Sequence, residues 1–136
     1  MAIAFSDDWA RAWGRALNES ADYRQAAMSW EGSIAAVVTL EPNASLGVYL
    51  DIWHGECRIA RAATPDDIAG ASYLLGGTPT AWRELFEGRL APVLALLTGR
   101  IQLARGDLAR LLPFGAAAKE LIRLAGTVDT EFPAGW

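Results

Sequence analysis

The residues best suited to covalent chemistry are the only histidine and the only cysteine of the chain, His54 and Cys57, in the stretch HGEC. A thiolate beside an imidazole could act as a nucleophile with its general base. However, Gly55 favours a two-residue hairpin turn whose side chains point outward, and no third group is placed to orient the imidazole. We therefore interpret HGEC as a surface turn rather than a catalytic dyad.

The acidic residues offer no stronger reactive pair. Asp66 and Asp67 could bind a divalent ion, but adjacent acids after a proline more often cap a helical turn. Glu84 and Glu87 lie on the polar side of a predicted helix and indicate a solvated face. One histidine and one cysteine cannot complete a zinc site, and GGTPTAW lacks the lysine and spacing of a phosphate-binding loop. We expect no catalytic residue, no metal and no cofactor, and hence no enzyme.

The composition predicts one folded domain. With 136 residues, of which 52% are hydrophobic and six are Trp, the chain can build a single core. We expect one domain over residues 1–136, with tails at 1–5 and 127–136, the second able to dock Phe132 and Trp136 on apolar surface. No apolar run approaches the roughly 20 residues that span a bilayer, and the start lacks the features of a secretory signal. A lone cysteine suits a reducing compartment, so we expect a cytoplasmic protein.

The charge of the chain is unevenly distributed. The net charge of −4 argues against nucleic acid as a partner. Residues 1–78 carry five Arg against ten acidic residues, which gives −5, whereas residues 79–126 carry six Arg and one Lys against four acidic residues, which gives +3. Ordinary solvated helix faces explain this distribution. The alternative is a weak attraction for an anionic head group or a membrane surface.

The triplet Arg105-Gly106-Asp107 has the composition of a cell-adhesion signal. Its surroundings explain each residue locally, because Gly106 ends a predicted strand and Asp107 occupies the N-cap position of the next helix. We interpret the triplet as a turn.

The pattern of apolar residues predicts a helix, then a block of strands, then short helices around a last strand. Residues 5–20 form a helix in which Ser6 is the N-cap and Trp9 and Trp13 share the apolar face. Residues 45–53 alternate between apolar and polar, as expected for a strand with one buried face. The other predicted strands are 33–40, 56–63, 71–77 and 100–104, and the other predicted helices are 78–87, 92–98, 108–113 and 114–126.

The later helices are rich in apolar residues but are interrupted by glycine and proline. Such short helices pack less continuously than one long helix, so gaps between them and the sheet are favoured. A gap lined by Leu, Phe and Trp would be dry and could accept an apolar chain, although simple core packing is the alternative. The residues that we expect to line it are Leu50, Trp82, Leu85, Phe86, Leu94, Leu97, Leu111, Phe114 and Leu121. The last helix, 114–125, could act as a lid.

Residues 73–112 carry an ordered set of residues that resembles a known family, the sterol carrier protein 2 (SCP2) domain family. The matching positions are Trp82, Leu85, Gly88, Leu90, Pro92, Gly99, Ile101, Leu103, Gly106, Asp107 and Leu111. The preceding order of elements, a helix and then several strands, also agrees, so the resemblance covers most of residues 5–125. Arg100 replaces the usual lysine after the second of these glycines, and the ending PAGW is no peroxisomal address, so the chain resembles bacterial stand-alone members.

The resemblance implies an α/β (α+β) fold with about five mainly antiparallel strands covered by helices, and an apolar tunnel for fatty acids, acyl-CoA, sterols or isoprenoids. Our leading hypothesis is therefore non-catalytic binding or transfer of a lipid. The alternative is an accessory or scaffold protein that dimerises or presents an isoprenoid intermediate to a partner enzyme. A third hypothesis is an esterase or thiol enzyme built on His54 and Cys57. Further partners that we consider are a membrane, contacted transiently, and a second copy of the chain.

Overall fold

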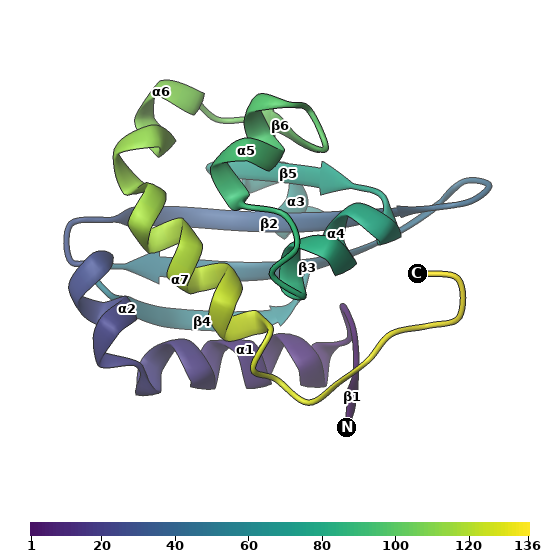
Figure 1. The fold of residues 1–136 in the computed structure, drawn as a ribbon, viewed down its shortest axis with the longest axis horizontal. Helices are drawn as coiled ribbons and strands as arrows, with labels where there is room; N and C mark the ends of the chain where they lie inside the picture. Colours follow the sequence, from purple (N-terminus) through teal and green to yellow (C-terminus); the bar gives the residue numbers. More distant parts are fainter.

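The computed structural model of the protein describes residues 1–136. The fold is built on a five-stranded sheet (Figure 1). The strand order is β4-β3-β2-β5-β6. β2 pairs antiparallel with β3, β3 with β4, and β5 with β6, whereas β5 runs parallel to β2. The sheet is therefore mainly antiparallel, as the resemblance implied. The strands are β2 Glu31–Leu40, β3 Ala44–Trp53, β4 Glu56–Ala62, β5 Tyr73–Gly77 and β6 Ile101–Arg105.

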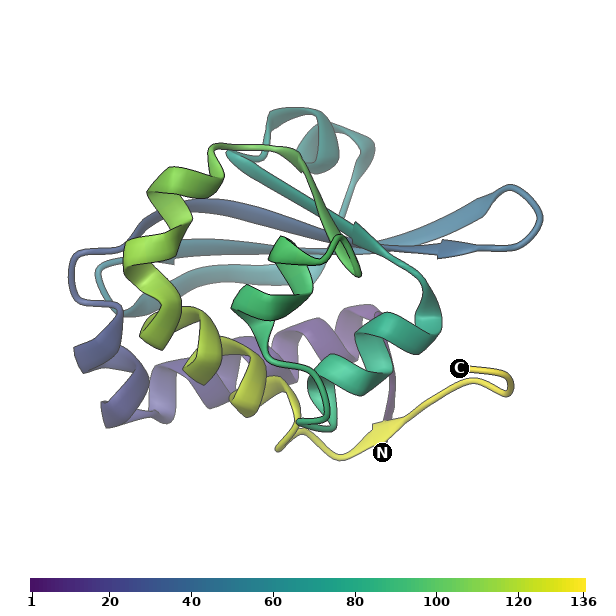
Figure 2. The ribbon, with the colours of Figure 1, turned by 45° about the horizontal axis from the view of Figure 1, so that its top comes forward.

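Helices cover one face of this sheet, and α3 lies on the opposite side (Figures 1 and 2). The short helix α2 was missing from our sequence interpretation, and α3 is the helical turn that we expected Asp66 and Asp67 to cap. None of the helices combines the length and the apolar character needed to cross a bilayer. The helices are α1 Asp7–Glu19, α2 Ala21–Ala26, α3 Pro65–Gly70, α4 Pro79–Phe86, α5 Pro92–Leu97, α6 Leu108–Leu111 and α7 Gly115–Ala125, with a 3-10 turn, η1, at Leu112–Phe114.

Polar caps set the beginnings of these helices where the sequence predicts them. The Ser6 side chain accepts from the Trp9 amide at 3.2 Å, and Thr78 accepts from the Ala81 amide at 3.2 Å. Asp107 accepts from the Ala109 amide at 2.9 Å, directly after the positive-φ residue Gly106. The adhesion-like triplet is therefore a strand end, a glycine turn and a helix cap, as predicted.

The hairpin between β3 and β4 turns at His54 and Gly55, whose φ angles of 47° and 87° belong to the left-handed region. Glycine adopts that region without strain, and two such residues join antiparallel strands tightly. The predicted two-residue turn is therefore confirmed.

The core lies between the sheet and the helical layer. The alternation of β3 buries Val48, Leu50 and Ile52 beneath the helices, as the pattern predicts. Leu46 continues this alternation but is 44% exposed. The far end of the β2–β3 hairpin extends beyond the helices (Figure 1), so its last side chains have nothing to pack against.

Both ends of the chain are held in the structure rather than being the tails that we expected. Residues Ala2–Ile3 (β1) pair in parallel with Thr130–Glu131 (β7). The Phe5 side chain is only 2% exposed, and its ring lies 5.2 Å from that of Trp9 and 5.8 Å from that of Trp136. Phe5 thus belongs to the aromatic core, and Phe132 and Trp136 pack against it, as we expected of these two residues.

Candidate functional site

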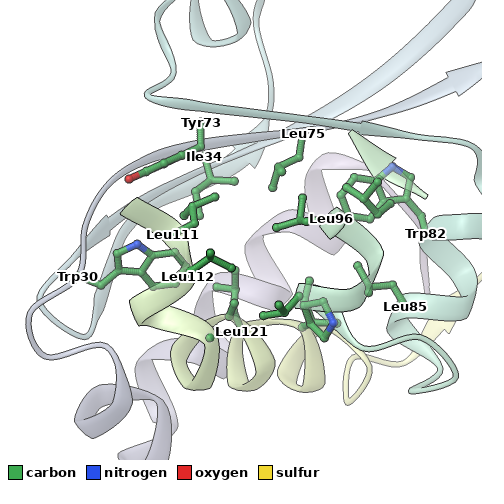
Figure 3. A pocket seen from close by; sticks show the side chains of 16 residues that line it. Trp30, Ile34, Tyr73, Leu75, Trp82, Leu85, Leu96, Leu111, Leu112 and Leu121 are labelled. Atoms are coloured by element: carbon green, nitrogen blue, oxygen red, sulfur yellow. The ribbon is translucent and has the colours of Figure 1, made fainter. Parts of the chain in front are cut away.

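An apolar cavity of about 70 Å³ lies between the sheet and the later helices (Figure 3). Fourteen of the sixteen residues that line it are hydrophobic. The sheet contributes residues from β2, β5 and β6, and the helical layer contributes residues from α4, α5, α6, η1 and α7. Trp30, directly before β2, also lines the cavity. The lining residues are Trp30, Ile34, Tyr73, Leu75, Trp82, Leu85, Pro92, Val93, Leu96, Ile101, Leu111, Leu112, Gly115, Ala118, Leu121 and Ile122.

The sheet and α4 form the firmest walls of the cavity. Ile34 on β2 and Leu75 on β5 lie on the sheet side, and Leu96 and Trp82 face them from the helices (Figure 3). The Trp82 indole is 1% exposed, and its Nε1 donates to the Val37 carbonyl of β2 at 2.9 Å. This bond satisfies the indole N–H and fixes the ring against the sheet.

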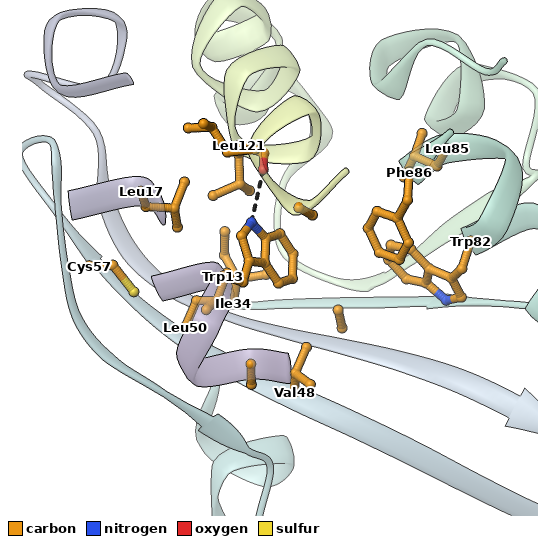
Figure 4. Packing of buried hydrophobic residues seen from close by; sticks show 14 of the residues in the cluster. Trp13, Leu17, Ile34, Val48, Leu50, Cys57, Trp82, Leu85, Phe86 and Leu121 are labelled. Atoms are coloured by element: carbon orange, nitrogen blue, oxygen red, sulfur yellow. Dashed lines mark hydrogen bonds between the residues drawn. The ribbon is translucent and has the colours of Figure 1, made fainter. Parts of the chain in front are cut away.

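The opposite wall is held unevenly. The C-terminal part of α7 is anchored, because Trp13 Nε1 donates to the Leu121 carbonyl at 2.9 Å in the buried core (Figure 4), and Leu124 and Ala125 are buried. By contrast, α6 and η1 contain no buried residue. Segments with little buried surface open most easily, so residues 108–114 are the weakest part of the wall.

Four of the residues predicted to line an apolar gap meet around this cavity: Trp82, Leu85, Leu111 and Leu121. Two more lie in the core beside or beneath it. Phe86 stacks on Trp82 with ring centroids 5.6 Å apart, and Leu50 is 1% exposed in the sheet (Figure 4).

The other three predicted residues do not line the cavity. The Phe114 ring stacks on Trp30, itself a lining residue, with centroids 5.7 Å apart. Leu94 and Leu97 are 53% and 60% exposed. The residues of α5 that face the cavity are instead Val93 and Leu96. Each lies one position before a residue that we predicted.

Sequence reasoning also missed Trp30, Ile34, Tyr73 and Leu75. Ile34, Tyr73 and Leu75 stand in predicted strands, but these strands are apolar at nearly every position, so no alternation distinguishes their inward-facing residues from the others. No local pattern identifies Trp30, which lies between α2 and β2 and meets the cavity only through tertiary packing.

The cavity wall offers van der Waals contact, and its lining contains no carboxylate, imidazole or thiol. A lining of this kind favours hydrocarbon over polar ligands. The arrangement is suited to holding an apolar chain, and the Tyr73 phenol is the one ionisable side chain in the lining.

His54 and Cys57 do not form a dyad in the structure. The His54 Nδ1 lies 2.8 Å from the Met28 carbonyl, and Nε2 lies 3.0 Å from a Glu31 carboxylate oxygen. The Cys57 side chain points into the core and donates to the Ile59 carbonyl at 3.2 Å. Burial raises the pKa of the thiol to about 12, so the thiolate is not available near neutral pH.

Asp67 is a structural residue, as the capping interpretation predicts. Its carboxylate bonds the Thr64 amide while Thr64 accepts from the Asp67 amide, which completes a capping box on α3. Its ion pair with Arg61, at 2.8 Å, is the main reason that the pKa of Asp67 lies below its usual value.

The structure is a mixed α+β fold with helices over one face of a mainly antiparallel sheet and an apolar cavity between the two layers. The profile of the SCP-2 sterol transfer family matches residues 13–119. The chain therefore belongs to this family, whose resemblance we identified from residues 73–112.

Solved structures agree with this assignment. A crystal structure of sterol carrier protein 2 is 41% identical, with a TM-score of 0.84 over 91% of this chain and 98% of that one. A Thermus thermophilus protein described as possibly a sterol carrier protein is 39% identical, with a TM-score of 0.85 over 96% and 93% of the two chains. The apo form of Yarrowia lipolytica sterol carrier protein 2, at 14% identity and a TM-score of 0.56 over 86% and 88%, shares the fold. The search of curated proteins finds no match.

Proposed function

We propose that this protein binds a lipid by its hydrocarbon chain in the cavity between the sheet and α5–α7, and carries it without chemical change. The observation that supports this proposal most strongly is the almost wholly apolar lining of the cavity. Membership of the SCP-2 sterol transfer family agrees with it. The lining contains no carboxylate, imidazole or thiol, which favours a carrier over an enzyme.

The driving force is the transfer of methylene groups from water into the apolar interior. Each buried methylene contributes about 0.8 kcal/mol, so eight would contribute about 6 kcal/mol before the costs of ordering the chain and the protein. Even without those costs, a gain of this size corresponds to a Kd of tens of micromolar, so tighter binding needs more than eight buried methylenes or further contacts.

The cavity must enlarge to accept such a chain. Its volume is about 70 Å³, whereas pockets for small-molecule ligands usually measure about 300–1,000 Å³. We infer that α6 and η1 move outward, because they are weakly buried, while α7 stays anchored through Leu121. Separation of the stacked Trp30 and Phe114 rings would open the wall at this end.

The binding of a lipid can be tested on the purified protein. Titration with palmitate should change the tryptophan fluorescence, because Trp30 and Trp82 line the cavity, and should saturate at one chain per protein. Solvent extraction of gently purified protein, followed by mass spectrometry, should recover lipid in a comparable ratio. A lipid-free protein whose fluorescence does not respond to palmitate would contradict the proposal.

A second candidate function is an accessory protein that presents its lipid, such as an isoprenoid, to a partner or dimerises. It is favoured by three exposed leucines, Leu94, Leu97 and Leu112, of which Leu112 also lines the cavity. Light scattering gives the oligomeric state, and solvent extraction gives the lipid content. A lipid-free stable dimer would support a scaffold, whereas a lipid-loaded monomer would support a carrier.

A further inference from the structure

A second hollow adjoins the apolar cavity on the outer side of α7. It is a groove of about 510 Å³ between α7, the segment 87–91 that joins α4 to α5, and the first residues of α5. The cavity and the groove share five lining residues, namely Leu85, Pro92, Val93, Gly115 and Ile122. The two hollows are therefore neighbours across one thin wall, one almost wholly apolar and the other open to polar groups.

Gly115, the first residue of α7, lines both hollows and has no side chain to separate them. A Cβ atom added there would meet only Val93 Cγ2, at 3.5 Å. Because Gly115 has no side chain and follows the weakly buried η1, a small outward shift of this end connects the groove with the cavity. A chain in the cavity could then place its end group in the groove.

The charges of the groove are paired with one exception. Glu87 bonds both Arg83 and Arg89, and Arg123 pairs with Glu120 at 2.8 Å. Lys119 lines the same groove from α7, is exposed, and has neither a hydrogen bond nor an ion pair. It is also the only lysine of the chain.

We propose that Lys119 binds the anionic head group of a single-chain lipid whose hydrocarbon tail occupies the adjoining cavity. This inference rests on the proposed lipid-binding function and adds a specificity-determining residue to it. The ammonium group supplies a positive charge at the polar end of the site, whereas the apolar cavity selects only for hydrocarbon. The protein should therefore prefer an anionic lipid to a neutral lipid of the same chain length.

The test compares palmitate with hexadecanol, which has the same number of carbons and no charge, by tryptophan fluorescence titration. Lys119→Gln should weaken palmitate binding by about two- to fivefold, the range of one solvent-exposed ion pair, and should leave hexadecanol binding unchanged. Lys119→Arg should retain palmitate binding. Arg15→Gln is the matched control, because Arg15 is also exposed and unpaired but lies on α1, away from the groove.

Each outcome decides one of the two proposals. Equal palmitate affinity of Lys119→Gln and the natural protein, equal losses for palmitate and hexadecanol, or an equal effect of Arg15→Gln would overturn the role of Lys119 while leaving lipid binding intact. If the natural protein binds neither lipid, the proposed function itself fails. A loss confined to palmitate and to Lys119→Gln supports the head-group site.

Discussion

Ala118→Leu is expected to weaken the uptake of palmitate by more than tenfold. Ala118 lines the cavity from α7, and three additional carbon atoms at this position would occupy the space of about 70 Å³ that a lipid chain must enter. The free energy of unfolding should be unchanged or about 1 kcal/mol higher, because the substitution fills a cavity and leucine suits a helix well. Fluorescence titration and urea unfolding measure the two effects separately.

The matched control for this variant is Ala116→Leu. Ala116 lies on the same helix but is exposed and does not line the cavity, so its replacement should leave palmitate uptake unchanged. Normal palmitate binding by a folded Ala118→Leu variant would show that the chain binds elsewhere. A similar loss in both variants would point to the helix as a whole rather than to the cavity.

Phe5→Ala is expected to lower the free energy of unfolding by about 3–4 kcal/mol, which is typical for removing a buried phenylalanine ring. The Phe5 ring packs within 6.1 Å, centroid to centroid, of four aromatic rings, those of Trp9, Trp82, Phe86 and Trp136. Its loss would leave a void at the junction of α1, α4 and the C-terminus. Urea unfolding followed by circular dichroism measures the change.

The neighbouring residue Ile3 provides the control, because its side chain is 52% exposed. Ile3→Ala should cost about 0.5 kcal/mol or less, as most surface substitutions do. A Phe5→Ala variant as stable as Ile3→Ala would mean that residues 1–5 are a loose tail, as we first expected.

The sequence predicted most elements of the fold because their boundaries depend on local chemistry. Ser6, Thr78 and Asp107 cap helices through side-chain bonds that span three residues or fewer, and Gly106 ends a strand. The pairing of the two chain ends could not be found in this way. It depends on contacts between residues more than 120 positions apart, such as the bond from Trp9 Nε1 to the Thr130 hydroxyl at 3.0 Å.

The candidate site was predicted only in part, and the errors have one physical origin. Trp82 and Leu85 belong to a helix of eight residues with a clear apolar stripe, so their direction could be predicted. In the six-residue α5, apolar residues occupy nearly every position, and the periodicity did not distinguish Leu96, which faces the cavity, from Leu94 and Leu97, which face solvent. Tertiary packing alone decides between them.

The proposed movement of α6 and η1 explains how a cavity of only about 70 Å³ can serve a lipid carrier. A wall with no buried residue can be displaced at small cost, whereas the sheet, α4 and the C-terminal part of α7 hold the remaining walls in place. In this account the apolar hollow selects the chain, and the adjoining groove receives the head group at Lys119.

The most direct measurement is a crystal structure of the protein with palmitate bound. We predict a hydrocarbon chain in contact with Leu75, Leu96 and Ala118, with α6 and η1 displaced outward and the bond from Trp13 to the Leu121 carbonyl intact. A chain lying on the exposed face of α5, beside a cavity that keeps its present size, would contradict the account.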